Sequence, residues 1–151
     1  MTFEGELASL LERENAILSD LEQCAQAKTE RIAKGDVAGM TELLNQEQPL
    51  VMHLQTMEAK RTALLKKYQL GGKTLSEICT SADYTYREIL ETRLEVLTSV
   101  AEKLKDRNRF NGELTKSRLE FYGKMRALVA KPAHGYDQEI TRERTLIDKT
   151  I

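Results

Sequence analysis

The sequence contains few side chains whose type and spacing could support catalysis or metal binding. Histidine is the commonest metal ligand and a frequent general base in proteins. His53 has no histidine, cysteine or carboxylate three or four residues further along the chain, and His134 stands between Ala133 and Gly135. Metal sites on helices place a second ligand at that spacing. We therefore expect neither histidine to bind a metal.

Acidic and glycine-containing segments lack the context of a catalytic site as well. Glu12, Glu14 and Glu22 have no histidine three residues later, which is the pairing that di-iron helical bundles use. The GGKT segment at residues 71–74 lacks the earlier glycine and the preceding strand of a phosphate-binding loop. The sequence thus predicts no catalytic residue, no cofactor and no metal site, and we expect that the protein is not an enzyme.

Composition favours a slender cytoplasmic protein that binds neither nucleic acid nor membrane. Of the 151 residues, 31% are charged and only 5% are aromatic, so the chain has little material for a thick core. The net charge is -1, which gives no electrostatic basis for binding phosphate backbones or anionic lipid. The N-terminus is acidic where a signal peptide is basic, and no window approaches the roughly 18 apolar residues of a spanning helix. Cys24 and Cys79 have no CxxC partner and are predicted to be reduced core thiols.

Apolar residues recur at helical spacing along most of the chain. The first predicted helix, at about residues 3–33, carries two parallel seven-residue ladders, so its apolar stripe is broad enough to contact more than one helix. These ladders are Leu10, Ile17, Cys24 and Leu11, Leu18, Ala25, Ile32.

Turn and cap residues divide the rest of the chain into three further helices. Gly35 can end the first helix and Asp36 can cap the second, which runs to about residue 68. Because the apolar ladders keep register across Pro49, we predict one bent helix there rather than two. A capping box at residues 74–77 predicts a short helix at 75–82, and a long helix follows at 84–130.

These elements predict an all-α fold with a single domain over residues 1–151. We expect an elongated antiparallel helical hairpin, or a three-helix coiled-coil-like bundle, with one very long helix. Short glycine-marked turns favour antiparallel neighbours. Residues 131–151 are predicted to form a mobile C-terminal tail, because they combine charge and glycine with isolated apolar residues.

The long helix carries amides where its apolar seam should continue. Leu90, Leu97 and Leu104 lead in seven-residue steps to Asn111, and a second series leads through Ala101 to Asn108. Polar residues on such a seam can fix the register of helix packing. Alternatively, this half of the helix is not a finished seam and serves a partner. The apolar residues Leu114, Phe121, Met125 and Leu128 form a separate stripe beyond the amides, and Tyr122 flanks it.

Four short stretches, in their order and spacing, resemble the FlgN family of flagellar export chaperones over most of the chain. They are the L-x-x-L-E-x-x-R-like Leu54, Met57, Glu58 and Arg61; Gly71 after Tyr68 and Leu70; the N-x-x-N-x-x-L-like Asn108, Asn111, Leu114 and Ser117; and the tail dipeptide Tyr136-Asp137.

The resemblance implies a cytoplasmic chaperone that binds C-terminal helical segments of the hook-filament junction proteins, also called hook-associated proteins. It would prevent their premature association and deliver them to the export apparatus, whose gate components are further expected partners. The expected partner-binding residues are Asn108, Asn111, Leu114, Phe121, Tyr122, Met125, Leu128, Tyr136 and Asp137. From the residues alone, a constitutive coiled-coil structural or adaptor protein stays open, as do a monomer and a homodimer.

Overall fold

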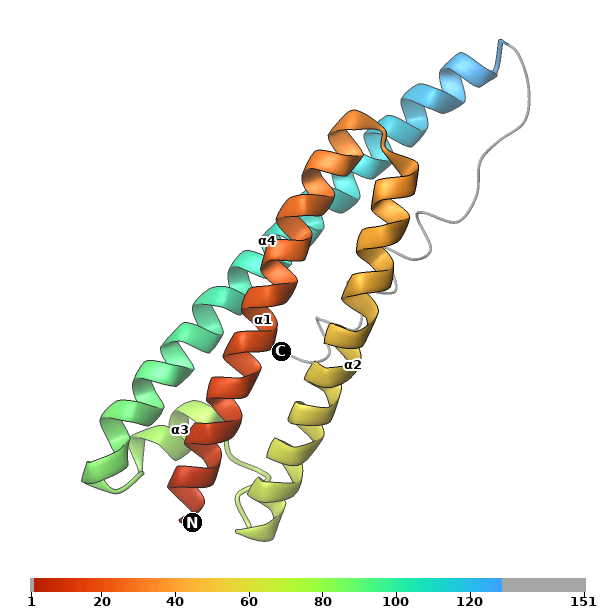
Figure 1. Ribbon diagram of the computed structural model, residues 1–151. Helices are drawn as coiled ribbons and strands as arrows, with labels where there is room; N and C mark the ends of the chain where they lie inside the picture. Colours follow the sequence, from red (N-terminus) through yellow and green to blue (C-terminus); the bar gives the residue numbers. More distant parts are fainter. Residues whose placement is uncertain (1, 129–151) are drawn as a thin grey trace.

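The computed structural model describes residues 2–128, and in this range the chain forms four helices and no strand (Figure 1). They are α1 (Phe3–Lys34), α2 (Val37–Lys67), α3 (Leu75–Thr80) and α4 (Tyr84–Arg126). The predicted all-α fold with one very long helix is confirmed, although α4 ends four residues before the predicted position. The predicted tail, residues 131–151, lies outside the described residues.

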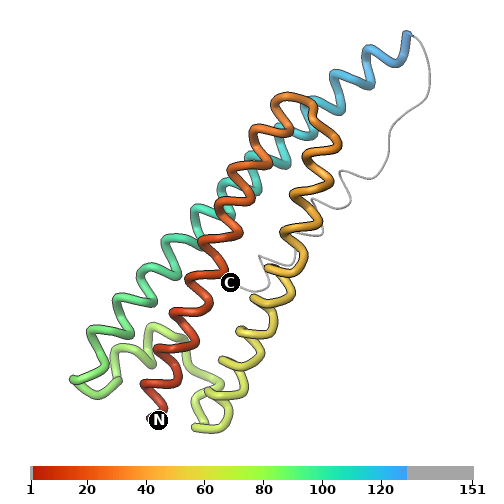
Figure 2. Tube along the Cα trace, in the orientation of Figure 1, coloured from red at the N-terminus to blue at the C-terminus, as the bar shows by residue number. Residues whose placement is uncertain are grey.

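The three long helices lie side by side with α1 in the middle. Helix α1 packs against both α2 and α4, which confirms the expectation from its broad apolar stripe, and the short α3 packs against α4. Within the described residues, α2 and α4 make no close backbone contact with each other. Figures 1 and 2 show that α2 runs antiparallel to α1, whereas α4 runs in the same direction as α1. The segment between α2 and α4, including α3, carries the chain across the end of the bundle.

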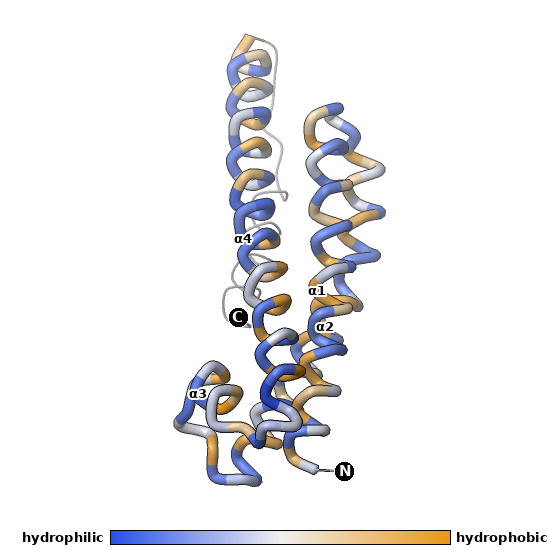
Figure 3. Tube along the Cα trace, turned by 90° about the vertical axis from the view of Figure 1, so that its left-hand side faces the viewer, coloured by the Kyte–Doolittle hydropathy of each residue, from blue (hydrophilic) through white to orange (hydrophobic). Residues whose placement is uncertain are grey.

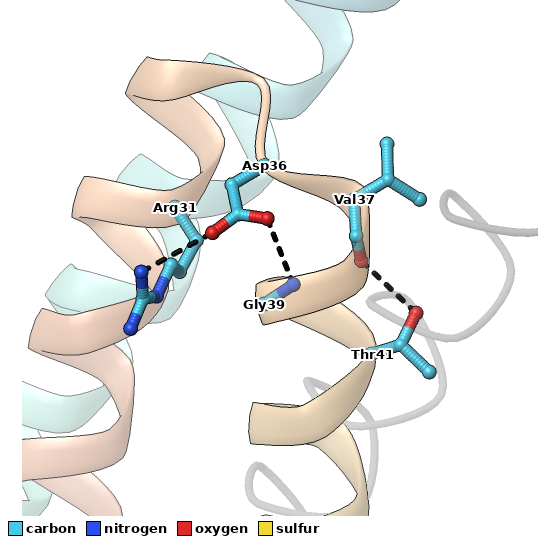
Figure 4. Close-up of polar contacts among 5 residues, drawn as sticks. All are labelled: Arg31, Asp36, Val37, Gly39 and Thr41. Carbon is cyan, nitrogen blue, oxygen red and sulfur yellow. Dashed lines mark hydrogen bonds and ion pairs between the residues drawn. The ribbon is translucent and has the colours of Figure 1, made fainter.

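The α1–α2 turn depends on local features that the sequence predicts. Gly35 ends α1 with φ +69°, a left-handed conformation that glycine adopts without a steric penalty. The Asp36 carboxylate then accepts a hydrogen bond from the Gly39 amide at 2.9 Å and pairs with Arg31 at 3.2 Å (Figure 4). Both the end of α1 and the start of α2 are therefore fixed by residues within the turn.

The second helix and the start of the third also lie where the sequence indicates, although α3 ends at Thr80, two residues before the predicted position. Helix α2 is continuous through Pro49, which lies on its exposed side, so the predicted single helix is confirmed. Thr74 and Glu77 form the predicted capping box at the start of α3: each side chain accepts a hydrogen bond from the other residue's backbone amide at 3.2 Å.

The core is a narrow apolar strip along α1 rather than a thick centre. Leu7, Leu11, Leu18 and Leu21 of α1 are almost completely buried, and residues from all the other helices pack against this strip. Figure 3 shows apolar and polar residues alternating along the whole length of the long helices. Cys79 is buried, as expected of a core thiol, whereas Cys24 is only half-buried.

Candidate partner-binding site

Side chains of α4 bind backbone carbonyl groups of α1 at three levels. Arg93 Nη1 donates to the carbonyl oxygen of Ala8 at 2.6 Å, Asn111 Nδ2 to that of Ala25 at 2.9 Å, and Arg118 Nη1 to that of Ala33 at 2.8 Å. Each acceptor is an alanine, whose small side chain leaves the helix backbone within reach of a neighbouring helix. These bonds fix how far α4 is shifted along α1.

The seam amides lie inside this α1–α4 interface. Asn111 is buried, and its Oδ1 lies 2.5 Å from the Thr29 hydroxyl, which can donate to it. Asn108 is buried as well, but its Nδ2 has no hydrogen-bond partner among the described residues, and the same holds for the Thr115 hydroxyl. The seam thus continues as a polar extension of the leucine ladder, and neither amide is accessible from the surface.

Arg118 marks the level at which α1 ends and α4 continues alone. Its second guanidinium nitrogen donates to the Tyr122 hydroxyl at 2.9 Å. A Cβ added at Gly35 would lie 2.9 Å from both of these side-chain atoms, so the α1–α2 turn touches α4 here. A Cβ at Gly123, one residue further, would meet nothing within 4 Å. Figure 1 shows the last part of α4 extending past the α1–α2 turn.

The end of α4 and the residues just after it expose large apolar side chains. The exposed fractions are 59% for Phe121, 41% for Tyr122, 54% for Met125 and 81% for Leu128. We call these four residues the tip surface. The rings of Phe121 and Tyr122 make an edge contact, with centroids 5.9 Å apart. Exposed apolar residues that gather in this way are typical of a binding surface.

Leu114 and the two predicted tail residues do not belong to the tip surface. Leu114 is half-buried and packs against a small cluster around Ile32 and Met40, so it joins α4 to the α1–α2 hairpin. Tyr136 and Asp137 lie outside the described residues. Of the nine residues predicted to bind a partner, the structure therefore brings four together on an exposed surface.

The family of this chain follows from sequence comparison. The profile of the FlgN protein family matches residues 1–142. The chain belongs to the FlgN family. A crystal structure at 1.48 Å resolution of a candidate flagella synthesis protein FlgN from Pseudomonas aeruginosa has the same fold, with a TM-score of 0.70 and 15% sequence identity. The match covers 97% of this chain and 96% of the other. No curated protein sequence matches the chain.

Membership in the FlgN family implies a general role as a flagellar export chaperone with flagellar partners, which confirms the resemblance drawn from the sequence. FlgN is a family of chaperones and not of enzymes. Between residues 2 and 128, no three histidine, cysteine or acidic side chains are grouped in a way that could hold a metal ion. None of the helices in this range combines the length and the apolar character that a membrane-spanning helix needs.

The FlgN-like stretch in α2 contributes to the core and to an ion pair. Leu54 and Met57 are buried, and Arg61 binds the carboxylate of Glu14 in α1 at 2.7 Å. Burial raises the pKa of the Glu14 carboxyl above its ordinary value, while Arg61 opposes this rise and Glu58 adds to it.

A second buried ion pair joins Lys28 of α1 to Glu47 of α2. Sequence reasoning missed both pairs, because their partners lie far apart in the chain and look like ordinary surface charges. The available signal was a further seven-residue series in the first helix, in which Glu14 lies seven residues before Leu21 and Lys28 seven residues after it.

Proposed function

We propose that this FlgN family member binds the C-terminal helical segments of hook-filament junction proteins in the cytoplasm and holds them until export. The tip surface, formed by Phe121, Tyr122, Met125 and Leu128, is the proposed docking surface for these client segments. The observation that carries the proposal is the exposure of these four side chains around the end of α4, where Tyr122 lies beside Gly35 of the α1–α2 turn and Leu128 follows the last residue of the helix.

The chemistry of the tip surface fits a helical client. Phe121 and Met125 are four residues apart on one face of α4, and Leu128 follows shortly after the helix ends, so these side chains can match the apolar stripe of a second helix. The charges nearby are mainly basic: Lys124 and Arg126 lie in the last turn of α4, while Glu120 is acidic. A client helix with an apolar stripe and acidic flanks would complement this surface.

Shielding by the tip surface would also permit release. A client segment whose apolar face is covered only after assembly tends to aggregate or to pair too early. Docking on α4 would cover that face, and ordering the segment would cost about 2 to 5 kcal/mol of the interaction energy. A complex of this kind can hold its client and still give it up at the export apparatus.

The double variant Phe121→Ser with Met125→Ser tests the proposal. Both side chains are about half exposed, so replacing them should remove on the order of 2 kcal/mol of apolar contact with the client and weaken binding by more than about tenfold. Calorimetric titration with a peptide that spans the C-terminal segment of a junction protein from the same genome measures this change. Circular dichroism should show unchanged helicity.

The matched control is Phe110→Ser with Met52→Ser, which removes the same side-chain types from exposed positions away from the tip surface. This control should bind the peptide as the unmodified chain does. Equal binding by the tip variant and the control would rule out the tip surface. If light scattering instead showed a tight dimer that the tip variant dissociates, the surface would be a contact between copies, as in a structural coiled coil.

A further inference from the structure

Helix α4 carries a second row of exposed apolar side chains, apart from the tip surface. Ile89, Val96 and Phe110 are 44%, 43% and 49% exposed. They are seven and fourteen residues apart, so they lie on one ladder of the helix, on which Lys103 takes the remaining place. Within residues 2–128, α4 packs only against α1 and α3, at the edge of the bundle (Figure 1). We call Ile89, Val96 and Phe110 the outer row.

The charges beside the outer row change sign along α4. The residues directly before the positions of this ladder are three acids followed by two bases: Glu88, Glu95, Glu102, Arg109 and Lys116. All five are exposed, and the three acids form no ion pair with another residue of the described chain. Charges in this position, beside an apolar row, determine which helix binds to it and in which direction. The outer row is therefore flanked by acid at one end and by base at the other.

We propose that the outer row is a contact between two copies of this chain, in which the two α4 helices run antiparallel. In this direction the acidic half of each helix lies against the basic half of the other. One register brings Glu95 opposite Arg109 of the other copy and Glu88 opposite Lys116. Because contacts across a two-fold axis are reciprocal, each of these ion pairs forms twice.

The same register joins the apolar residues of the two outer rows. Phe110 of one copy lies between Ile89 and Val96 of the other, as a knob does in coiled-coil packing. A parallel pair of helices would instead place Lys103 opposite Lys103 and Asp106 opposite Asp106, and like charges that face each other oppose binding. Charge and apolar packing thus favour the same antiparallel direction.

The proposed contact is weak and leaves the tip surface accessible. Arg109 has to exchange its exposed ion pair with Asp106, at 3.1 Å, for one with the other copy, and the two Glu102 side chains face each other at the centre. A small interface with these costs is typical of dissociation constants in the micromolar range. Residues after Arg118 extend past Tyr84, the start of α4 in the other copy, so a client can still bind at the tip.

Charge reversal tests the contact and its direction. Glu95→Arg places two arginines opposite each other and should weaken dimerisation by about tenfold or more, measured by light scattering over a series of concentrations. Adding Arg109→Glu to this variant reverses both members of each ion pair, so it should restore dimerisation to within about threefold of the unmodified chain. Glu102→Gln removes the like charges at the centre and should strengthen dimerisation by about threefold or more.

The apolar part of the contact has its own variant and control. Phe110→Ser should weaken dimerisation by about tenfold or more, whereas Met52→Ser, at an exposed apolar position of α2, should leave it unchanged. Circular dichroism should show that every variant keeps its helicity. Binding of the junction-protein peptide by Phe110→Ser should equal that of the unmodified chain, so the inference and the proposed function can fail separately.

Three results would overturn the inference. The first is an unmodified chain that stays a monomer up to about 1 mM, since a contact this weak would have no role. The second is a dimer that Glu95→Arg weakens whether or not Arg109→Glu is present, because the two residues would then not face each other. The third is a dimer that dissociates on substitution of the tip surface but not on substitution of Phe110, which would place the contact at the tip.

Discussion

Replacing Asn111 by alanine tests whether the polar seam holds α4 in place on α1. Asn111 is buried between the two helices; its amide nitrogen donates to the Ala25 carbonyl group at 2.9 Å, and its oxygen lies 2.5 Å from the Thr29 hydroxyl. The alanine variant would lose both interactions and leave a small cavity. Because the Thr29 hydroxyl also lies 3.1 Å from the Ala25 carbonyl oxygen, it would keep one acceptor.

The magnitude follows from these contacts. A hydrogen bond contributes about 0.5 to 1.5 kcal/mol to stability, so two bonds correspond to about 1 to 3 kcal/mol. The acceptor that Thr29 retains reduces this loss, and the cavity increases it. We expect Asn111→Ala to lower the free energy of unfolding by about 2 kcal/mol.

Asn108 is the comparison that makes this prediction specific. It is buried on the same interface, but its amide nitrogen has no partner within residues 2–128. Asn108→Leu removes that unsatisfied donor and buries more apolar surface, so it should raise the free energy of unfolding by about 1 kcal/mol.

Urea unfolding followed by circular dichroism measures both variants, and an unchanged denaturant dependence would show that only stability has changed. If both variants changed the free energy of unfolding in the same direction, the reasoning would be refuted. The helices would then not be held together specifically by the hydrogen bonds of Asn111.

Two further predictions concern Glu14 and the glycines. Burial raises the pKa of the Glu14 carboxyl in the folded state, so the folded chain binds the carboxyl proton more tightly than the unfolded chain does. The free energy of unfolding of the native protein, compared with that of Glu14→Gln, should therefore rise as the pH falls from neutral toward the ordinary glutamate range. Urea unfolding at several pH values measures this difference, which the exposed variant Glu30→Gln should not reproduce. Gly35→Ala should lower the free energy of unfolding by about 1 to 2 kcal/mol, because φ is +69° and the added Cβ would lie 2.9 Å from side-chain atoms of α4. Gly123→Ala, in open helical space, should instead raise it by about 0.5 kcal/mol in thermal unfolding, and similar effects at both glycines would contradict this reasoning.

Helix boundaries could be predicted because the residues that set them act locally. The left-handed Gly35, the Asp36 cap and the capping box at Thr74 and Glu77 each involve groups within a few residues of one another. Apolar ladders that keep register across Pro49 likewise indicated one helix. Such features depend on the backbone and on neighbouring side chains, so a sequence displays them directly.

The partner and direction of α4 could not be predicted in the same way. Short turns favour antiparallel neighbours, but the chain crosses the end of the bundle through α3, and α4 packs parallel to α1 instead of against α2. The bonds that select this arrangement join residues more than 80 positions apart, such as Arg93 with Ala8 and Asn111 with Ala25. No pattern of neighbouring residues in the sequence indicates these contacts.

Phe121 and Met125, near the end of α4, are expected to contribute little to the stability of the described fold. Beyond Arg118, which binds the end of α1, the helix continues for two more turns, and Phe121 and Met125 there are about half exposed. Serine at these positions would cost the fold little, because few contacts would be lost and no cavity would form. If Phe121→Ser with Met125→Ser nevertheless lowered the free energy of unfolding by the roughly 3 to 5 kcal/mol typical of a truncated core, these side chains would belong to the core. An unchanged free energy together with weak client binding would show that the tip contributes to binding and not to folding.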